Sequence, residues 1–203
     1  MESIKELYLS IENSLMNDEK PSDNINYLAN KEIFKEKPFS MILELKKIEQ
    51  SPIYHPEGNV WNHVMLVIDE AAKLRHKSKD KKAFMWAALL HDIGKPPTTK
   101  VRKGRITSYD HDKEGEKMAI EFLSYFSEDE EFKIKVSKLV RYHMHILYVL
   151  KNLPFKDIEG MKKNVDLEEL ALLGLSDRLG RLGKNREEEK ENIKKFIKIV
   201  NTK

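Results

Sequence analysis

The stretch Ala83–Pro97 reads AFMWAALLHDIGKPP, and the fold can be interpreted outward from it. Its apolar residues recur with helical spacing, and a glycine with two prolines behind it predicts that the helix ends at Gly94. His91 and Asp92 stand side by side just before this end. A carboxylate there is costly to bury unless a cation meets it, and a divalent metal is the simplest such cation. A core histidine beside a capped aspartate would also explain the pair, so a metal site requires partners elsewhere in the chain.

Composition and charge predict a soluble globular protein. The 203-residue chain is long enough for one domain with a substantial core. Its 37 basic and 34 acidic residues give a net charge of +3, which is too balanced to indicate a nucleic-acid or membrane protein by itself. Cysteine is absent, so a metal would be held by His, Asp and Glu. Neither a signal peptide nor an apolar run of about 18 residues is present, which predicts a cytoplasmic protein with no membrane partner.

Hydrophobic periodicity predicts an all-α fold with one small β-hairpin or loop insertion. Residues 1–50 read as an N-terminal helical appendage, with two helices separated by polar sequence, and residues 51–203 as the functional domain. The segment TTKVRKGRITSY at 98–109 alternates apolar and basic residues around a Lys-Gly pair, which predicts the hairpin. Its basic tip is either an ordinary solvated turn or a flap over an anionic substrate. The other apolar stripes predict helices at 60–76, 110–126, 130–143, 166–177 and 186–200.

Metal-competent side chains replace apolar residues on the buried faces of five different predicted helices. These are His63, His91, His111, His143 and Asp177, with Asp92 adjoining one of them. A plain helical bundle would leave several of these groups unsatisfied, whereas convergence on metal would satisfy them together. Six nitrogen and oxygen ligands around a central carboxylate suit two open octahedral sites better than one four-coordinate zinc. We therefore expect two divalent ions, and the sequence does not distinguish Mn, Fe, Ni, Mg and Zn.

The order of these residues resembles the His…His-Asp…Asp pattern of the HD-domain metal-dependent phosphohydrolases. Further segments resemble the HD domain that follows the nucleotidyltransferase head in bacterial CCA-adding enzymes and related polynucleotide polymerases. They are HPEGNVWNH at 55–63, LLHDIGKP at 89–96, YDHDKEG at 109–115, RYH at 141–143 and SDRLGR at 176–181. The resemblance covers residues 52–182 and implies an all-helical HD fold with a metal site in the core of the bundle.

The sequence also departs from these families. Residues 1–50 are too few for a nucleotidyltransferase head, and no Gly-Ser followed by paired acidic ligands occurs, so polymerase activity is not implied. Ile93-Gly94-Lys95 stands where the (p)ppGpp-hydrolysing HD enzymes have Glu-Asp, which disfavours that activity. His111 and His143 match the additional histidines of two-metal HD phosphodiesterases, which favours a dinuclear centre.

The resemblance implies a phosphodiesterase or phosphatase that uses a metal-activated hydroxide. We expect His63, His91 and Asp177 to hold one ion and His111 and His143 the second, with the Asp92 carboxylate between them. Lys95 and Arg178 are the expected catalytic and substrate-binding cations, although each could equally be a surface charge. Further substrate-binding candidates are Arg105 in the hairpin, His145 if the helix ends near His143, and His55 at the mouth of the site.

The implied substrates are nucleotides, cyclic nucleotides or RNA-end phosphates. The basic surface is too small to indicate duplex DNA, and no interleaving of aromatic and basic residues suggests base stacking. Two other classes of function stay open. One is a non-catalytic nucleotide- or RNA-binding module with structural metal, and the other is an HD-type di-iron oxygenase.

Overall fold

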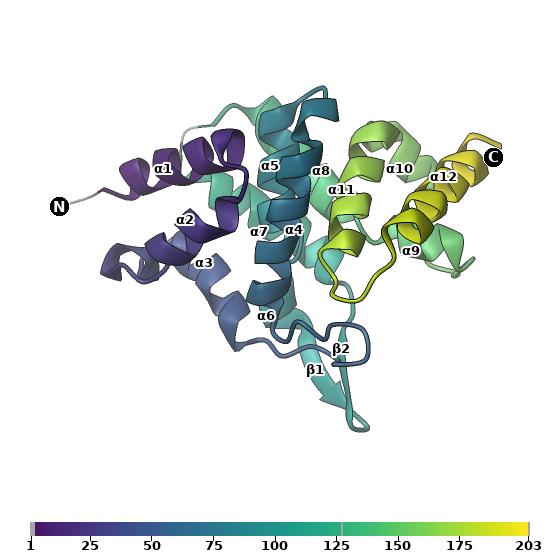
Figure 1. Ribbon diagram of the computed structural model, residues 1–203, viewed down its shortest axis with the longest axis horizontal. Helices are drawn as coiled ribbons and strands as arrows, with labels where there is room; N and C mark the ends of the chain where they lie inside the picture. Colours follow the sequence, from purple (N-terminus) through teal and green to yellow (C-terminus); the bar gives the residue numbers. More distant parts are fainter. Residues whose placement is uncertain (1–2, 127, 203) are drawn as a thin grey trace.

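The computed structural model describes residues 3–126 and 128–202, and helices dominate it (Figure 1). Four helices form its centre: α4 (Val60–Leu74), α5 (Lys81–Leu90), α8 (Glu130–Tyr142) and α11 (Leu167–Leu179). Helix α5 packs against α4, α8 and α11, and α7 (His111–Ser124) packs along α8. The all-α prediction is confirmed. Within the described ranges, no helix is both long and apolar enough to cross a membrane.

The chain turns after α5, but the helix ends four residues before Gly94, where the glycine and prolines predict its end, and the prolines belong to the next helix. Helix α5 ends at Leu90, and after a turn of four residues α6 (Lys95–Thr98) begins. Both prolines lie in the first turn of the short helix α6. Proline is tolerated there because the first N–H groups of a helix have no partner within the helix. Gly94 lies in the turn with its Cα against the backbone of α7. His91 and Asp92 are therefore presented from a turn that α7 holds in place.

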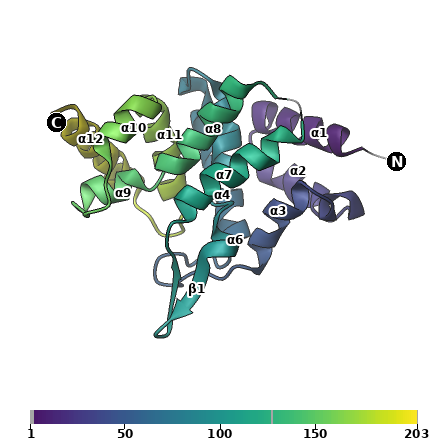
Figure 2. The same ribbon diagram turned by 180° about the vertical axis from the view of Figure 1, so that it is seen from behind.

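The predicted hairpin is present. Strands β1 (Thr99–Arg102) and β2 (Arg105–Ser108) pair antiparallel, with Val101 opposite Ile106. Both views show it projecting from the helical body below α6 (Figures 1 and 2). The hairpin leads directly into α7, so its base lies beside the first residue of that helix.

The N-terminal segment packs on the same hydrophobic core as the rest of the chain. Its elements are α1 (Ile4–Asn17), α2 (Pro21–Leu28), η1 (Glu32–Lys35), α3 (Phe39–Leu43) and η2 (Glu44–Lys47). Tyr8 stacks on Trp86 of α5 with ring centroids 4.6 Å apart, and Ser22 donates a hydrogen bond to Asp69 of α4. Pro21 begins α2, a helix that lies within the polar sequence expected to separate the two N-terminal helices. The domain boundary at residue 50 stays a prediction.

The C-terminal third contains two helices that the sequence does not predict. Helix α9 (His145–Leu150) has the sequence HILYVL, and α10 (Ile158–Asn164) has IEGMKKN. Both are too short to show an apolar period of 3.6 residues. The predicted last helix is α12 (Arg186–Thr202), which packs on α9 and α11, and a short η3 (Arg75–Lys77) follows α4. Figure 1 shows α9, α10 and α12 on the opposite side of the central helices from α1–α3.

Candidate metal centre

The Asp92 carboxylate lies at the centre of a buried group of imidazoles. Its Oδ1 atom is 3.5 Å from Nε2 of His111 and 3.9 Å from Nε2 of His143. Its Oδ2 atom is 3.3 Å from Nε2 of His91 and 4.0 Å from Nε2 of His63. The same ring nitrogen of all four histidines therefore faces one carboxylate, and these histidines come from four separate segments.

Asp177 completes the set of six predicted ligands. Its Oδ1 atom lies 3.0 Å from Nε2 of His63. The other ring nitrogen of His63, Nδ1, faces the carboxylate of Glu57. Two groups of ligand atoms, each compact enough for one ion, meet at the shared carboxylate: His63, His91 and Asp92, and Asp92, His111 and His143. The structure thus brings all six side chains together, although Asp177 belongs to neither of these two compact groups and lies beside His63. Their role as ligands is a proposal.

Backbone carbonyls fix the orientation of three of these imidazoles. In each case Nδ1 donates to the carbonyl oxygen three residues earlier, at 2.8 Å for His91, 2.7 Å for His111 and 2.6 Å for His143. A carbonyl can only accept, so Nδ1 carries the proton of the neutral ring and the lone pair is on Nε2. All three lone pairs are therefore directed at the centre, in the tautomer that a metal ligand requires.

The arrangement of His111 and His143 fits a bound cation and fits an empty core poorly. Their Nε2 atoms lie 3.3 Å apart. With both Nδ1 protons given to carbonyls, two lone pairs face each other with no hydrogen between them. Two nitrogens at the usual ~2.0–2.1 Å from one ion would be about 3.0 Å apart in octahedral and about 3.4 Å apart in tetrahedral geometry. The spacing matches a pair of ligands on one ion.

Charge states in the site also suit a metal. Burial opposes ionisation of Asp92, yet the charges of Lys95 and His91 hold the pKa of this carboxyl well below its usual value. Burial, with the neighbouring imidazoles, lowers the pKa of His143 to about 3, and burial also lowers the pKa of His111. At neutral pH the centre therefore contains an anionic Asp92 and neutral His111 and His143 imidazoles, which are the forms that bind metal. Burial opposes protonation of His91, but the charges of Asp92 and Asp177 raise the pKa of this imidazole.

Two buried atoms of the centre accept no hydrogen bond among the described residues: Nε2 of His91 and Oδ2 of Asp92. Lys95 Nζ lies 2.7 Å from Asp92 Oδ2 and forms an ion pair with it, but the two groups do not have the geometry of a hydrogen bond. Unsatisfied polar atoms are rare in protein interiors and call for an explanation. A metal ion between the imidazole and the carboxylate would satisfy both atoms. The direction of the Nε2 lone pairs, the spacing of His111 and His143 and these two unsatisfied atoms all fit a divalent metal centre.

Glu57 orients His63 and was not singled out from the sequence. Its Oε1 atom accepts hydrogen bonds from Nδ1 of His63 at 2.9 Å and from Nδ1 of His55 at 2.8 Å. Burial opposes ionisation, but these two hydrogen bonds lower the pKa of Glu57 to about 2. A carboxylate on the outer nitrogen of a metal-binding imidazole fixes the ring and raises its basicity. The only sequence signal was an acid six residues before His63, in a loop whose path the sequence does not reveal.

Replacing Glu57 with glutamine is expected to weaken metal binding about 10- to 100-fold, because the neutral amide loses the charge that supports His63. Competition with a chromogenic chelator measures the affinity. Glu49→Gln is the matched control, since Glu49 is an exposed acid at the rim of the same pocket. Equal affinities in the two variants would show that Glu57 does not support the centre.

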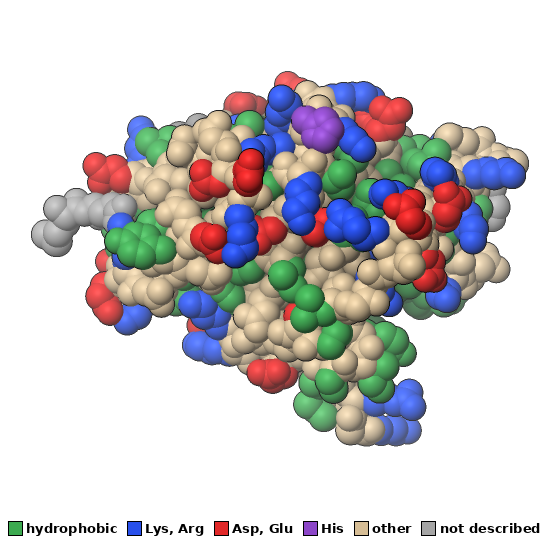
Figure 3. Space-filling model, viewed as in Figure 1, with side chains coloured by type: hydrophobic (Ala, Val, Ile, Leu, Met, Phe, Trp, Pro, Cys, Tyr) green, Lys and Arg blue, Asp and Glu red, His purple; other side chains and the backbone are tan. Residues whose placement is uncertain are grey.

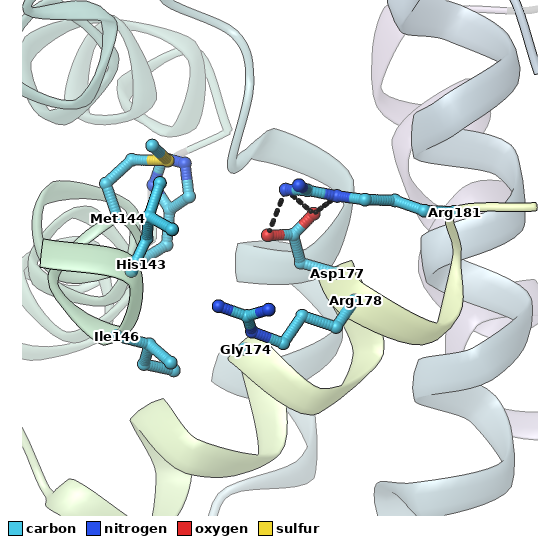
Figure 4. A pocket seen from close by; sticks show the side chains of 8 residues that line it. His143, Met144, Ile146, Gly174, Asp177, Arg178 and Arg181 are labelled. Atoms are coloured by element: carbon cyan, nitrogen blue, oxygen red, sulfur yellow. Dashed lines mark hydrogen bonds and ion pairs between the residues drawn. The ribbon is translucent and has the colours of Figure 1, made fainter. Parts of the chain in front are cut away.

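The cations around the centre differ in part from those expected. Lys95 is buried and donates to Oε1 of Gln50 at 2.7 Å, in addition to its ion pair with Asp92. Arg181 donates two hydrogen bonds of 2.9 Å to Asp177, one to each carboxylate oxygen, as Figure 4 shows. Arg178 instead pairs with Glu189 of α12 at 3.0 Å. Its guanidinium is therefore already occupied, and Arg181 is the arginine beside the ligands.

The remaining substrate-binding candidates lie in different places. His55 lines the pocket above the centre. Arg105 is exposed in β2 and does not contribute to the pocket wall. The helix does end before His143, as the expectation for His145 required, but the His145 ring packs against Tyr142 and Tyr148 and does not line the pocket. Both its ring nitrogens lack a hydrogen-bond partner among the described residues.

A cavity of about 580 Å³ opens above the centre. Its floor contains Asp92, His111, His143 and Asp177, together with the cations Lys95 and Arg181. A second, water-sized cavity of about 20 Å³ lies behind His143 and Asp177 and is lined by Arg178 (Figure 4). The larger cavity is the one that could admit a substrate to the ligand atoms.

The fold and this centre define the class of protein. The family model for the HD domain matches residues 60–182, which is more than half of the chain, and the chain belongs to this family. HD domains are metal-dependent phosphohydrolases that bind divalent metals, and all six side chains of the centre lie within the matched region.

Curated relatives share part of their length with this chain. The Multifunctional CCA protein of Actinobacillus pleuropneumoniae serotype 5b is 28% identical over 156 residues, covering 73% of this chain and 38% of the relative. That of Mannheimia succiniciproducens is 29% identical over 143 residues, covering 64% and 32%. That of Aromatoleum aromaticum is 43% identical over 51 residues, covering 25% and 12%. The chain spans less than two-fifths of the length of these relatives.

Proposed function

We propose that the protein is a two-metal phosphohydrolase that acts on nucleotides, cyclic nucleotides or RNA-end phosphates. The observation that carries the proposal is the convergence of four imidazole Nε2 atoms and two carboxylates beneath one open cavity, whose wall includes Asp92, Asp177, His111 and His143. A purely structural metal site would be closed by protein ligands, whereas this one is reached from a cavity of about 580 Å³.

Each residue of the centre has a proposed task. Bound divalent ions would lower the pKa of coordinated water toward ~7 and withdraw charge from a phosphoryl oxygen. The Asp92 carboxylate lies between the two ligand groups and holds them together. Lys95 lies beside Asp92 in the cavity wall. Its positive charge would attract the oxygens of a phosphate that binds there. Arg181 fixes Asp177 in its rotamer and presents its guanidinium to the cavity.

Turnover of bis-p-nitrophenyl phosphate and of a panel of nucleotides and 2′,3′-cyclic nucleotides tests this function. The protein is loaded in turn with Mn²⁺, Ni²⁺, Mg²⁺, Zn²⁺ or Fe²⁺, with and without oxygen. We expect hydrolysis without oxygen and at least about 10³-fold less in the His91→Ala, Asp92→Ala variant, because metal assistance contributes several kcal/mol. Full activity in that variant would place the reaction elsewhere. Nucleotide binding without turnover would indicate a binding module, and oxygen uptake with iron an oxygenase.

A further inference from the structure

Exposed aromatic rings surround the mouth of the cavity above the metal centre. Tyr54, Tyr109 and Phe155 line it, and they are 65%, 63% and 58% exposed. They come from three separate segments: the loop before α4, the end of the hairpin and the loop after α9. Single exposed hydrophobic residues are ordinary on protein surfaces, whereas a group of them at one opening is informative, and here three aromatic rings share one opening. We call these three residues the aromatic rim.

The hairpin beside this rim has positive charge that no acid among the described residues neutralises. Lys100, Arg102, Lys103 and Arg105, the hairpin cations, make no ion pair within the described part of the chain, and the hairpin contains no acid. Arg102 and Arg105 are direct cross-strand partners, an arrangement in which like charges repel. Surface lysines elsewhere commonly pair with an acid three residues away, as Lys47 does with Glu44.

Contact between the two features makes them one surface. The Arg102 guanidinium lies over the Tyr109 ring, 5.1 Å from its centroid. Arg102 and Tyr109 are seven positions apart in the sequence, and the pairing of β1 with β2 brings them together. Basic and aromatic side chains therefore lie side by side on the surface although they are not adjacent in the sequence. Figure 3 shows Lys and Arg side chains at the hairpin tip, with hydrophobic side chains between the tip and the body. Arginine stacked on an aromatic ring extends the flat surface available to a base.

The size of the surface indicates a ligand larger than one nucleotide. The cavity wall runs along β2 from Ser108 through Thr107 to Ile106, and Arg105 is the next residue on this strand. The cavity therefore extends from Asp92 on its floor to the side of the hairpin that carries the hairpin cations. A ligand with several phosphates and several flat rings would contact the floor, the aromatic rim and the hairpin cations together.

Resting on the proposed hydrolysis of phosphate esters at Asp92, we propose that the substrate is the end of a single-stranded oligonucleotide. The terminal phosphate occupies the metal centre, the last bases stack on the aromatic rim, and the following phosphates meet the hairpin cations. An acidic peptide would satisfy the cations but offers no row of flat rings to the aromatic rim. Single-stranded nucleic acid offers both, because aromatic stacking and a basic track are how proteins hold it.

Binding of a ten-nucleotide oligoadenylate with fluorescein at its 5′ end and a phosphate at its 3′ end tests the proposal, measured by anisotropy from low to moderate salt with metal-loaded protein. RNA and DNA of the same sequence are compared. The test variant is Arg102→Gln, Lys103→Gln, Arg105→Gln. The matched control, Lys5→Gln, Lys195→Gln, Lys198→Gln, removes the same charge from exposed positions on α1 and α12. We expect at least about tenfold weaker binding and a salt slope shallower by about 2 in the test variant alone, since single strands give about −0.7 per phosphate contact.

Substitutions of Tyr109 test the contribution of stacking to binding separately from that of charge. Tyr109→Ala is expected to weaken oligonucleotide binding about tenfold, whereas Tyr109→Phe keeps the ring and should bind as the native protein does. Equal losses in the two triple variants, equal binding of poly-glutamate, or no effect of Tyr109→Ala would each overturn the proposal.

Hydrolysis of bis-p-nitrophenyl phosphate is measured in parallel, because this small ester needs only the metal centre. Turnover without oligonucleotide binding would reject this surface and leave the proposed function standing. Oligonucleotide binding without any turnover would reject the proposed function and leave the surface standing as a nucleic-acid site.

Discussion

Replacing Asp92 with asparagine is expected to lower kcat/KM for phosphate esters by at least about 10³-fold and to release metal from the protein. Asparagine has the same shape but no charge, and among the residues that the structure describes Asp92 is the one carboxylate within reach of four imidazole Nε2 atoms. The change would also leave the Lys95 ammonium buried beside a neutral amide, 2.7 Å away. Both ligand groups lose their shared member, so the effect exceeds that of removing a single histidine.

Metal content after dialysis and turnover of bis-p-nitrophenyl phosphate measure this effect together. The matched control is Asp69→Asn, since Asp69 is also buried but accepts its hydrogen bonds from the backbone and side chain of Ser22. We expect the control to keep both metal and activity at the cost of some stability. An Asp92→Asn protein that retained native metal content and rate would exclude this carboxylate from the centre.

The sequence carried enough information to find the six side chains of the centre, for a physical reason. Polar residues on an otherwise apolar helical face are costly to bury, so His63, His143 and Asp177 stand out against the period of 3.6 residues. The structure brings them together because their helices share one core. Tautomers and distances required the structure, since they depend on which backbone carbonyl each ring meets.

Residues that act through loops and helix ends could not be found in the same way. Glu57 lies in a loop before α4, where no periodicity indicates which way a side chain points. Arg178 and Arg181 are both cations after a ligand, and only the position of Glu189 on α12 decides which of them is occupied elsewhere. The contact of Arg102 with Tyr109 likewise depends on hairpin pairing, so a linear reading for adjacent basic and aromatic residues misses it.

Packing at Gly94 gives the second prediction with a large effect. A Cβ at this position would lie 2.1 Å from the carbonyl oxygen of His111, and 2.5 Å and 2.9 Å from N and Cα of Gly115. All three are backbone atoms, so no side chain can swing away to make room. Carbon and oxygen in contact need about 3.3 Å, and the turn after α5 would have to move away from α7 by about 1 Å.

We therefore expect Gly94→Ala to lower the free energy of unfolding by about 3 kcal/mol or more, at the upper end of what overpacking costs. The same displacement separates Asp92, on the turn, from His111, on α7, which lie 3.5 Å apart. A shift of about 1 Å can cost a reaction 10²-fold, so metal affinity and turnover should fall in the protein that still folds.

Urea unfolding of the metal-free protein separates the packing effect of Gly94→Ala from the loss of metal, which chelator competition measures on its own. Gly104→Ala is the control, because Gly104 has a φ of +72° but open space around it. That variant should lose only about 1–2 kcal/mol from left-handed backbone strain and should bind metal normally. If both variants unfolded at the same urea concentration and bound metal equally, the close contact between the turn and α7 would have no part in building the centre. A selective loss of metal in Gly94→Ala would instead identify this glycine as the packing residue that sets the distance between the two ligand groups.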